Sequence, residues 1–519
     1  MVLLDYTGRL KLQCNNDSEI KVALQIQGLT RSKKYEGLFS APPEILVVHD
    51  LSNYFTSNKI KLEFTEELIK WGKYTEDKYA DSIQQQTVKK EVNTTFPLRD
   101  YQKEAINWIS KTDACILGDE PGLGKTAASL FGSADCDKVL ITCPAYVASH
   151  WERHIEDLLG EKVTDGFSDK NTNKRLERIT ESNYKYVIVN HELLRSNTAI
   201  NILSRKNFSA FIIDEAHKFQ GRNTQQSDGA SSLSQTIKKN ILLTGSVIWN
   251  TPASVWKLLN IIDSVRFSSY WGFVERFCLT EDSPWGTTVG DIKPSMVDTF
   301  KWVLSPYLLR RKKVDVAKDL PPKVYSVVNY TVDVKKYNSI KKDDTLTPMR
   351  KVISLRDSCN CKQKAATLLN ILEDNKGQQI VIFAWYHNTI KHLQEVLAKS
   401  KIDFLTVSGK QDPTDRVVIL DRFRNKETDI LIAGIGSITY GVDLDNATVG
   451  IFYEMDWVPT NNAQAEDRLH RIKSKKSVNI INIIGKGTIE EHIYDINKEK
   501  INVTEELIII NEVIKRMHL

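Results

Sequence analysis

Short, continuous runs of apolar residues recur along most of the chain, and longer stretches with helical spacing separate them. Runs of this kind, without polar residues at alternate positions, are typical of parallel strands that helices cover on both faces. They fall into two sets, which predicts an α/β fold with two parallel-sheet lobes. The first set is Lys138–Cys143, Tyr186–Asn190, Ala210–Asp214 and Asn240–Gly245; the second is Gln379–Trp385, Phe404–Ser408, Asp429–Ile435, Val449–Met455 and Val478–Gly485.

The chain before residue 81 has a different pattern, in which short β-like runs alternate with polar turns. These runs are Leu10–Leu12, Lys21–Ile26, Glu44–Val48 and Lys59–Phe64. The pattern predicts a small N-terminal α+β module. The following segment is polar and without periodicity, as in a linker. We expect a module at 1–80, a linker at 81–95, a first lobe at 96–265, a helical insertion and inter-lobe connection at 266–345, a second lobe at 346–487 and a C-terminal helical brace at 488–519.

The composition indicates the class of protein. The 519 residues are 41% hydrophobic and 26% charged, as in globular proteins, and 71 Lys and Arg against 66 Asp and Glu leave a net charge of +5. Such a charge predicts no nucleic-acid partner by itself. The seven cysteines are sparse, so we expect a reducing, intracellular environment and no structural zinc. The sequence has no apolar leader and no run long enough to cross a bilayer, so we expect a soluble protein without a membrane partner. Frequent Lys, Ile and Asn suggest an AT-rich bacterial or phage genome.

The strongest chemical signal follows the apolar run Ala114–Leu117. A glycine-rich stretch, Gly118 to Thr126, leads from this run into a helix-like segment. Glycines let backbone N–H groups turn toward phosphates, Lys125 would neutralise the β and γ oxygens, and Thr126 would bind magnesium. The standard first glycine of a phosphate loop is replaced by Asp119. A glycine-rich turn without a ligand is the alternative.

Two carboxylates and two arginines are the expected partners of this loop. Asp214 and Glu215 follow an apolar strand, where Asp214 could hold magnesium and Glu215 could orient and deprotonate the attacking water. Two acids after a strand can also be an exposed loop or a helix cap. Arg468 and Arg471 are three residues apart and are expected to share a helix face, from which they could act as arginine fingers. A solvated basic helix face is the alternative there.

With these motifs the chain resembles the Swi/Snf family of superfamily-two helicases, from Phe96 to about Glu491. Leu98–Gln102 resembles the adenine-reading motif, Gly118–Thr126 the family's variant of the phosphate loop with its aspartate, and Asp214–His217 the DEAH box. The most specific stretch is Leu309–Val316 with Leu320–Lys323. Second-lobe motifs follow in the expected order: Val407–Lys410, Gly441 with Leu444, Asp456–Pro459 and Gln464–Ile472.

The resemblance implies two RecA-like lobes, ATP and Mg²⁺ as cofactors, and DNA, duplex or branched, held mainly by its backbone. The implied nucleotide-binding residues are Arg99, Gln102, Asp119, Gly122, Gly124, Lys125, Thr126, Gly441, Arg468 and Arg471. The implied DNA contacts are Pro144, Asn190, His191, Ser408, Gly409, Lys410, Gly436, Ser437 and Trp457. The basic run Arg310–Lys313 could touch phosphate or position the second lobe. Val247, Asp443 and Lys473–Ser474 depart from the family pattern without removing a catalytic group.

The biological task is open at this point. Residues Tyr35–Pro42 and Leu51–Phe55 resemble the HARP-type modules that precede the motor in annealing helicases and phage branch-migration enzymes; an unrelated α+β adaptor is the alternative. The first expectation is an ATP-dependent translocase that remodels branched DNA by fork regression, annealing or branch migration in replication, recombination or repair. The alternatives are a motor that displaces proteins or RNA polymerase from duplex DNA or remodels chromatin, and a non-catalytic DNA-binding scaffold.

Overall fold

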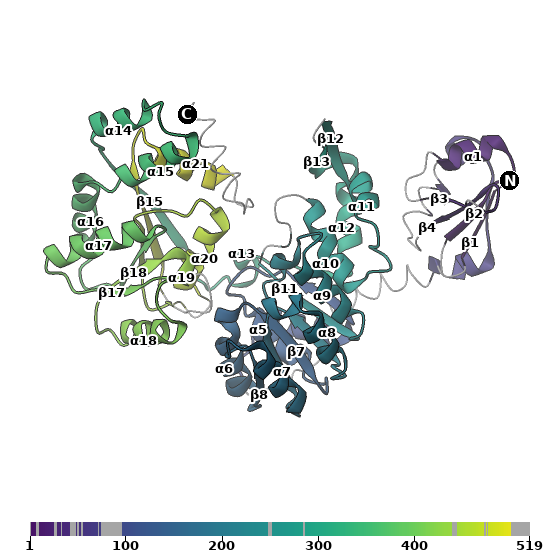
Figure 1. The fold of residues 1–519 in the computed structure, drawn as a ribbon, viewed down its shortest axis with the longest axis horizontal. Coiled ribbons are helices and arrows are strands. Elements are labelled where there is room, and N and C mark those ends of the chain that lie inside the picture. The colour runs from purple at the N-terminus through teal and green to yellow at the C-terminus, as the bar shows by residue number, and fades with distance from the viewer. Residues whose placement is uncertain are drawn as a thin grey trace. The chain divides into compact units, whose positions relative to one another are not determined.

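The structure is a computed structural model, and Figure 1 shows its fold. It describes residues 2–6, 10–24, 29–32, 34–41, 48, 51–52, 55–70, 72–73, 96–245, 247, 252–283, 286–438, 444–471, 474 and 476–499. The chain divides into two compact units, which we describe separately: Met1–Asp119 with Gly124–Arg311, and Glu120–Leu123 with Lys312–Leu519. The expected linker at 81–95 and most of the expected brace at 488–519 lie outside the described residues.

The N-terminal part of the chain forms a five-stranded sheet with strand order β3-β4-β2-β1-β5. Its elements are β1 Val2–Tyr6, β2 Leu10–Gln13, α1 Asp17–Leu24, β3 Thr30–Arg31, β4 Leu38–Ala41 and β5 Leu62–Phe64. The prediction of a β-like run at Lys21–Ile26 is wrong, because residues 21–24 belong to helix α1. Val22 and Ala23 are both buried there, as adjacent residues on the inner face of a helix can be.

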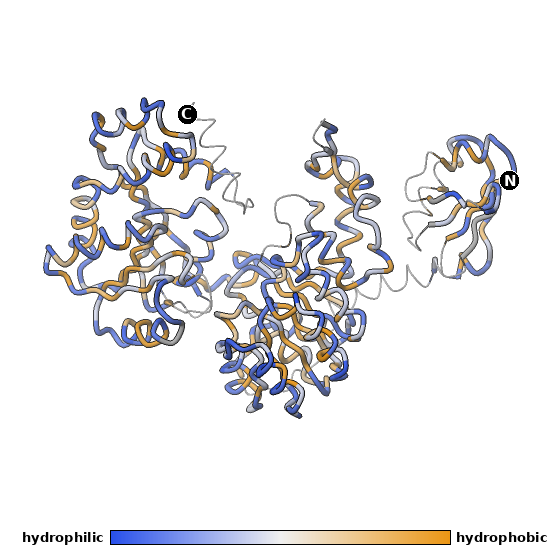
Figure 2. Tube along the Cα trace, in the orientation of Figure 1, coloured by the Kyte–Doolittle hydropathy of each residue, from blue (hydrophilic) through white to orange (hydrophobic). Residues whose placement is uncertain are grey.

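The next sheet has seven parallel strands in the order β14-β6-β11-β10-β7-β9-β8. The strands are β6 Ala114–Leu117, β7 Val139–Cys143, β8 Val163–Gly166, β9 Tyr186–Asn190, β10 Ala210–Ile213, β11 Lys239–Leu243 and β14 Leu308–Leu309. Its longer helices are α4 Asp100–Lys111, α5 Lys125–Gly132, α6 Ala148–Leu159, α7 Thr172–Glu181, α8 Asn197–Ser204 and α9 Gln225–Ser234. In Figure 2 the strands of this sheet are mostly apolar, and alternate residues of several strands belong to one buried core.

The segment between β11 and β14 is mainly helical, with α10 Val255–Ile262, α11 Tyr270–Phe277 and α12 Val297–Leu304. It also contains an antiparallel hairpin, β12 Cys278–Ser283 and β13 Gly286–Ile292, which the sequence did not predict. The rings of Phe273, Phe277 and Phe300 pack edge to face or tilted, with centroids 4.9 to 6.0 Å apart. These contacts hold α11 against α12, and all three rings belong to the same buried core as residues of the first sheet.

The second unit contains a six-stranded parallel sheet with strand order β15-β20-β19-β16-β18-β17. Its strands are β15 Lys323–Tyr330, β16 Ile380–Ala384, β17 Leu405–Val407, β18 Ile430–Gly434, β19 Val449–Phe452 and β20 Val478–Gly485. Its helices are α13 Lys313–Val316, α14 Val334–Lys341, α15 Pro348–Ser358, α16 Lys362–Asp374, α17 His387–Lys399, α18 Pro413–Arg424, α19 Ile435–Ile438, α20 Pro459–Leu469 and α21 Ile489–Glu499.

The expectation of two parallel-sheet α/β lobes with an N-terminal α+β module is confirmed. The sheets nevertheless extend beyond the expected limits of the lobes. β14 continues the first sheet past residue 265, and β15 begins the second sheet before residue 346. No helix among the described residues is long and apolar enough to cross a membrane. Nor do three or more His, Cys, Asp or Glu side chains gather there in a metal-ligand cluster.

Candidate active site

A phosphate loop connects β6 to α5 at the carboxyl edge of the first sheet. The backbone adopts left-handed conformations at Gly122, with φ of 87°, and at Gly124, with φ of 84°. Residues with a Cβ rarely adopt such angles, so glycine is needed at both positions. Helix α5 begins at Lys125, and no side chain caps its N-terminus. Backbone N–H groups at such a helix start are suited to bind phosphate oxygens.

The adenine-reading motif lies directly against this loop. The backbone N–H of Arg99 donates to Oε1 of Gln102 over 2.9 Å, which fixes the Gln102 side chain at the start of α4. A Cβ built on Gly124 would come within 2.3 Å of Nε2 of Gln102. The loop and this side chain therefore form one tight cradle, and its residue types fit a nucleotide with a phosphate tail.

Lys125 and Thr126 occupy the first turn of α5. Nζ of Lys125 donates to the backbone carbonyl of Asp119 over 2.7 Å, so the lysine spans the loop. Thr126 is half-buried at the same helix start, where a hydroxyl can bind magnesium. The carboxylate of Asp119 points elsewhere: it is 2% exposed and pairs with Arg311 at 2.5 Å.

Two acidic residues follow β10, two strands from β6 in the sheet. Asp214 accepts hydrogen bonds from Nε1 of Trp151 at 2.8 Å and from the backbone N–H of Glu215 at 2.9 Å. Burial, and then the charge of Glu215, raise the pKa of Asp214 to about 6, while Lys125 acts to lower it. A carboxylate in such a setting gains from a cation nearby, as a magnesium ligand would.

Glu215 has an unusual backbone, with a left-handed φ of 47°. Strain of this kind in a residue other than glycine concentrates at functional sites. Oε2 of Glu215 lies 3.2 Å from Nδ1 of His217, and the same nitrogen lies 3.3 Å from Oγ1 of Thr244. Thr244 in turn donates its backbone N–H to the carbonyl of Leu117, just before the phosphate loop. This chain of contacts links Glu215 to the loop through neighbouring strand ends.

In the second unit, Arg468 belongs to α20, whereas Arg471 lies beyond the end of that helix. The expectation that they share a helix face is wrong, because α20 ends at Leu469 and His470 is non-helical, with φ of −107° and ψ of 83°. Both arginines have partners within the structure. The expected nucleotide residue Gly441 lies outside the described residues.

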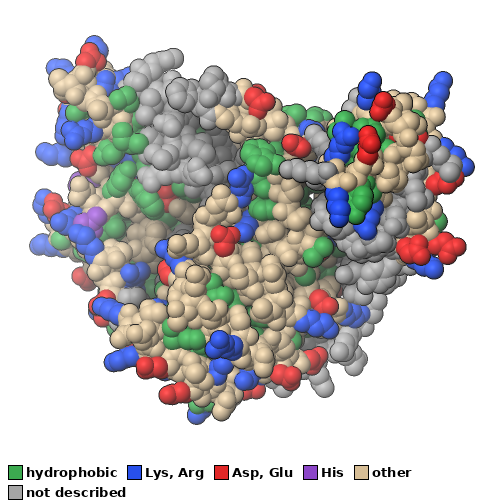
Figure 3. All heavy atoms as spheres, turned by 45° about the vertical axis from the view of Figure 1, so that its right-hand side comes forward, with side chains coloured by type: hydrophobic (Ala, Val, Ile, Leu, Met, Phe, Trp, Pro, Cys, Tyr) green, Lys and Arg blue, Asp and Glu red, His purple; other side chains and the backbone are tan. Residues whose placement is uncertain are grey.

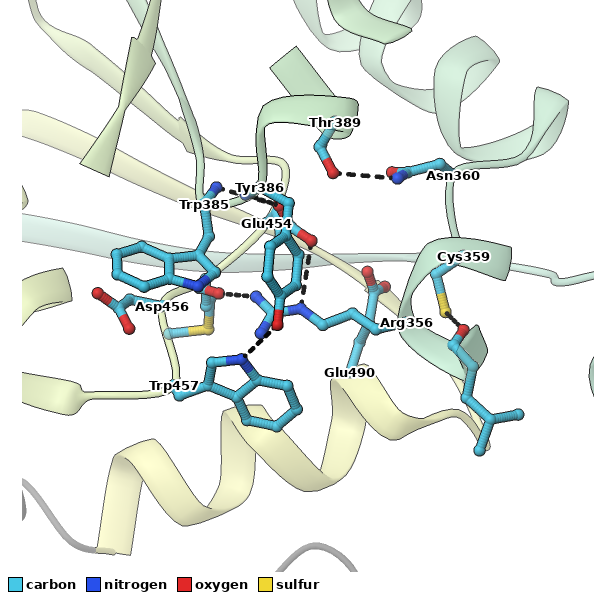
Figure 4. A network of polar contacts seen from close by, with 12 residues as sticks. Arg356, Cys359, Asn360, Trp385, Tyr386, Thr389, Glu454, Asp456, Trp457 and Glu490 are labelled. Carbon is cyan, nitrogen blue, oxygen red and sulfur yellow. Dashed lines mark hydrogen bonds and ion pairs between the residues drawn. The ribbon is translucent and has the colours of Figure 1, made fainter. Parts of the chain in front are cut away.

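Trp457 is part of a buried polar network, shown in Figure 4. Its indole is fully buried, stacks 4.4 Å from the guanidinium of Arg356 and donates from Nε1 to the Tyr386 hydroxyl over 3.0 Å. Glu454 pairs with Nε of Arg356 at 3.2 Å and accepts the backbone N–H groups of residues 385 and 386. The Trp457 side chain is therefore not available for the expected DNA contact; it holds the ends of β16 and β19 together.

The expected DNA-contacting residues of the first unit follow β7 and β9, which are neighbours in the sheet. Nδ1 of His191 lies 3.0 Å from Oγ1 of Thr142, and burial lowers the pKa of His191 to about 3. Asn190 accepts from Nη1 of Arg175 at 3.1 Å. The expectation of DNA contacts at Pro144 and His191 is wrong, because both residues are buried. Asn190 is only half-buried.

The corresponding residues of the second unit come together at the ends of β17 and β18. Gly409, Lys410 and Gly436 are exposed, Ser437 is half-buried and Ser408 is buried. A Cβ on Gly409 would lie 3.8 Å from Oγ of Ser437, so the two loops are adjacent. The sequence did not predict that His387 and Lys391 join them: burial and then the charges of Lys410 and Lys391 lower the pKa of His387. Lys410 and Lys391 therefore lie near His387 at these strand ends. Figure 3 shows one face of the molecule, on which basic and acidic side chains are interspersed.

Comparisons with known proteins identify relatives of this chain. The SNF2-related domain matches residues 101–381, more than half of the chain, and the helicase conserved C-terminal domain matches residues 363–473. The chain is 26% identical to the DNA annealing helicase and endonuclease ZRANB3 of Bos taurus, over 78% of this chain and 40% of that protein. It is also 26% identical to an uncharacterized ATP-dependent helicase of Mycoplasma pneumoniae, over 78% of this chain and 41% of that protein.

The chain thus spans less than half the length of these two relatives. A Chromodomain-helicase-DNA-binding protein 1-like of Mus musculus is 26% identical, over 80% of this chain and 50% of that protein. Among solved structures, the Sulfolobus solfataricus SWI2/SNF2 ATPase core in complex with dsDNA is 20% identical, covering 83% of this chain and 97% of that chain, with a TM-score of 0.40. On the family match across residues 101–381, the chain belongs to the SNF2-related family of helicase-type ATPases.

Proposed function

We propose that this chain hydrolyses ATP with Mg²⁺ to move along duplex DNA. The observation that carries the proposal is the shared sheet edge of the phosphate loop and the acidic pair. β6, which leads into Lys125, and β10, which leads into Asp214 and Glu215, are separated only by β11, which leads into Thr244. Ligands of parallel α/β sheets bind at this edge.

Each residue has a chemical task in this proposal. Gln102 reads the adenine, and the N–H groups of the phosphate loop with Lys125 hold the phosphates. Thr126 and Asp214 would hold magnesium, which neutralises charge on the β and γ oxygens when it is bound. Glu215 orients the attacking water and takes its proton. Arg468 and Arg471 stabilise the charge that develops on the γ-phosphate, as arginine fingers do.

DNA is held mainly through its phosphates in this proposal. The half-buried Asn190 supports a contact in the first unit, and the exposed Gly409, Lys410 and Gly436 support one in the second. Contacts with phosphates carry little sequence information, which suits a protein that must shift along its substrate.

For the biological task we propose remodelling of branched DNA, with the N-terminal module as the reader of the junction. The support is the separate five-stranded module and the likeness to a protein named as a DNA annealing helicase. A second candidate is chromatin remodelling or displacement of proteins from duplex DNA. It is favoured by the likeness to a protein named as a Chromodomain-helicase-DNA-binding protein.

The test is an ATPase panel with forked, four-way and linear duplex DNA of equal length. We expect DNA to stimulate hydrolysis, and Lys125→Ala and Glu215→Gln to abolish it. A preference for branched DNA that disappears on deletion of residues 1–95 supports the junction-reading role. Equal stimulation by all three DNA forms contradicts branched-DNA remodelling and favours the second candidate. Absence of any DNA-stimulated hydrolysis contradicts the motor itself and favours a DNA-binding scaffold.

A further inference from the structure

We propose that Arg311 and Lys313 are positioning residues for ATP hydrolysis. Each lies where the chain passes between the two units, and each contacts proposed nucleotide-binding or catalytic residues of its own unit. The inference rests on the proposed ATPase function. The chain passes from the first unit to the second between Arg311 and Lys312. Arg311 contacts Asp119 of the phosphate loop, within the first unit, and Lys313 contacts the arginine-bearing helix α20, within the second.

Strand register brings Arg311 to the phosphate loop. β14 pairs in parallel with β6, so that Leu308 lies opposite Ile116 and Leu309 opposite Leu117. The backbone N–H of Gly118 donates to the carbonyl of Leu309 over 2.7 Å. Two residues beyond the last pair, Asp119 and Arg311 meet, although 192 positions separate them in the sequence.

Asp119 and Arg311 share several hydrogen bonds, and both side chains are mostly buried. Oδ1 of Asp119 accepts the backbone N–H of Arg311 at 3.0 Å and its Nε at 3.1 Å, and Oδ2 accepts Nη2 at 2.5 Å. The side chains are 2% and 12% exposed. Bidentate pairs of this kind fix orientation as well as adding energy. The aspartate in place of the standard glycine thus has a partner that holds the loop.

Arg311 also reaches the adenine-reading helix. Its guanidinium lies 5.2 Å from the ring centroid of Tyr101, and Nη1 donates to the Tyr101 carbonyl, one residue before Gln102. The carbonyl of Asp119 accepts the Lys125 ammonium. One side chain therefore fixes both α4, which carries Gln102, and the loop that carries Lys125. Its loss should chiefly weaken nucleotide binding.

Lys313 makes the equivalent contact in the second unit. Its Nζ donates to Oδ1 of Asp467 over 2.6 Å and to the carbonyl of His470 over 3.4 Å, at the point where α20 ends. Lys323 also pairs with Asp467, at 3.1 Å. Asp467 precedes Arg468, and His470 precedes Arg471. Loss of Lys313 should therefore disturb both arginines and chiefly lower kcat.

The two neighbouring cations provide matched controls. Arg310 and Lys312 are exposed, whereas Arg311 and Lys313 are half-buried with carboxylate partners. The four cations of this run therefore alternate between solvent and protein. Arg310→Gln and Lys312→Gln remove the same charges as the test variants without removing these contacts.

The experiment compares Arg311→Gln, Lys313→Gln and the two controls in the full chain. Affinity for a fluorescent ATP analogue with Mg²⁺ is measured without DNA, and kcat and KM for ATP are measured at saturating duplex DNA. We expect Arg311→Gln to weaken nucleotide affinity at least about tenfold, as loss of a buried charged hydrogen-bond partner does. We expect Lys313→Gln to lower kcat about tenfold or more, with a smaller loss of nucleotide affinity than Arg311→Gln. Lys313→Arg should recover part of kcat, and both controls should match the wild type.

A double variant separates loss of the Asp119–Arg311 contact from a general effect on folding. If Arg311 acts through Asp119, the double variant Asp119→Asn with Arg311→Gln should bind nucleotide no worse than the weaker single variant. Additive losses, or controls that lose as much as the test variants, overturn the inference. Because nucleotide affinity is measured without DNA, a wild type that binds nucleotide but is not stimulated by DNA contradicts only the proposed motor function. If DNA stimulates ATP hydrolysis by the wild type and Arg311→Gln keeps the wild-type nucleotide affinity, only this inference is contradicted.

Discussion

Gly124 brings the proposed phosphate loop against the Gln102 side chain. Its φ of 84° disfavours any side chain, and a built Cβ would lie 2.3 Å from Nε2 of Gln102, which would have to move. We expect Gly124→Ala to lose most of its ATP affinity. The matched control is Gly160→Ala, because Gly160 has a similar φ of 67° but nothing within 4 Å of a built Cβ.

Both glycine variants should lose about 1 kcal/mol of folding free energy from backbone strain, measured by thermal unfolding. Only Gly124→Ala should lose binding of the fluorescent ATP analogue. Equal binding by the two variants would mean that the cradle does not hold the nucleotide.

Glu215 combines a strained backbone with a carboxylate beside His217. Glu215→Gln keeps the shape of the side chain but removes the proton acceptor. We therefore expect kcat to fall by about 10²-fold or more, the usual contribution of general acid–base catalysis. ATP affinity should stay close to that of the wild type in the same binding assay. A large loss of affinity with little change in kcat would instead place Glu215 among the nucleotide-binding groups.

At the residue scale, the sequence indicated candidate side chains for nucleotide chemistry, because they lie in short continuous motifs, and their roles stay predictions. It did not predict the partner of Asp119, because the Arg311 contact depends on the pairing of β14 with β6. It also could not distinguish an exposed Trp457 from the buried indole that stacks on Arg356. Such pairings depend on three-dimensional packing that local patterns do not encode.

Helix α20 provides a test at the scale of one element. Asp467 is held by Lys323 and Lys313; burial opposes ionisation, but these two cations prevail and lower its pKa to about 2. A carboxyl whose pKa is lower in the folded state stabilises the fold above its unfolded pKa, near 4, and this contribution is lost as the pH falls toward 2. Asp467→Asn should therefore cost about 2 kcal/mol at neutral pH, and less as the pH falls below 4.

Urea unfolding of the wild type and Asp467→Asn between pH 7 and pH 3 measures this pH-dependent difference in stability. The control is Asp403→Asn, which removes an exposed carboxylate from the same unit and should change stability little at any pH. A stability difference between the wild type and Asp467→Asn that stays constant down to pH 3 would contradict the role of the ionised Asp467.

Elements were predicted from the sequence where a continuous apolar run made the strand obvious, as for β7, β9, β10 and β20. The prediction failed at Lys21–Ile26, where alternating apolar residues gave a strand pattern to a segment that includes part of a helix. It also missed β15, where Val324 and Tyr325 are largely exposed and β20 supplies the hydrogen bonds. β15 forms because it pairs with β20, and a single sequence does not reveal which strands pair.

At the scale of the whole chain, a net charge of +5 is too small to hold DNA through bulk attraction. The proposed DNA contact must instead come from local groups, such as the exposed Lys410 with Lys391 and His387 nearby. Affinity for duplex DNA should fall with salt, with a slope of about 0.9 for each phosphate that is neutralised. Lys410→Ala should weaken binding similarly on every DNA sequence and reduce this slope by about one.

Binding titrations on two unrelated duplexes between 50 and 200 mM salt, a range over which counterion release changes affinity strongly, would measure both effects. Lys399→Ala is the control, since it removes an equally exposed lysine at the opposite end of α17 from His387. If both variants lower the slope equally, the DNA is held by the general charge of the surface. A change in Lys410→Ala alone places a phosphate at the ends of β17 and β18, where the backbone of Gly409 and Gly436 is also exposed.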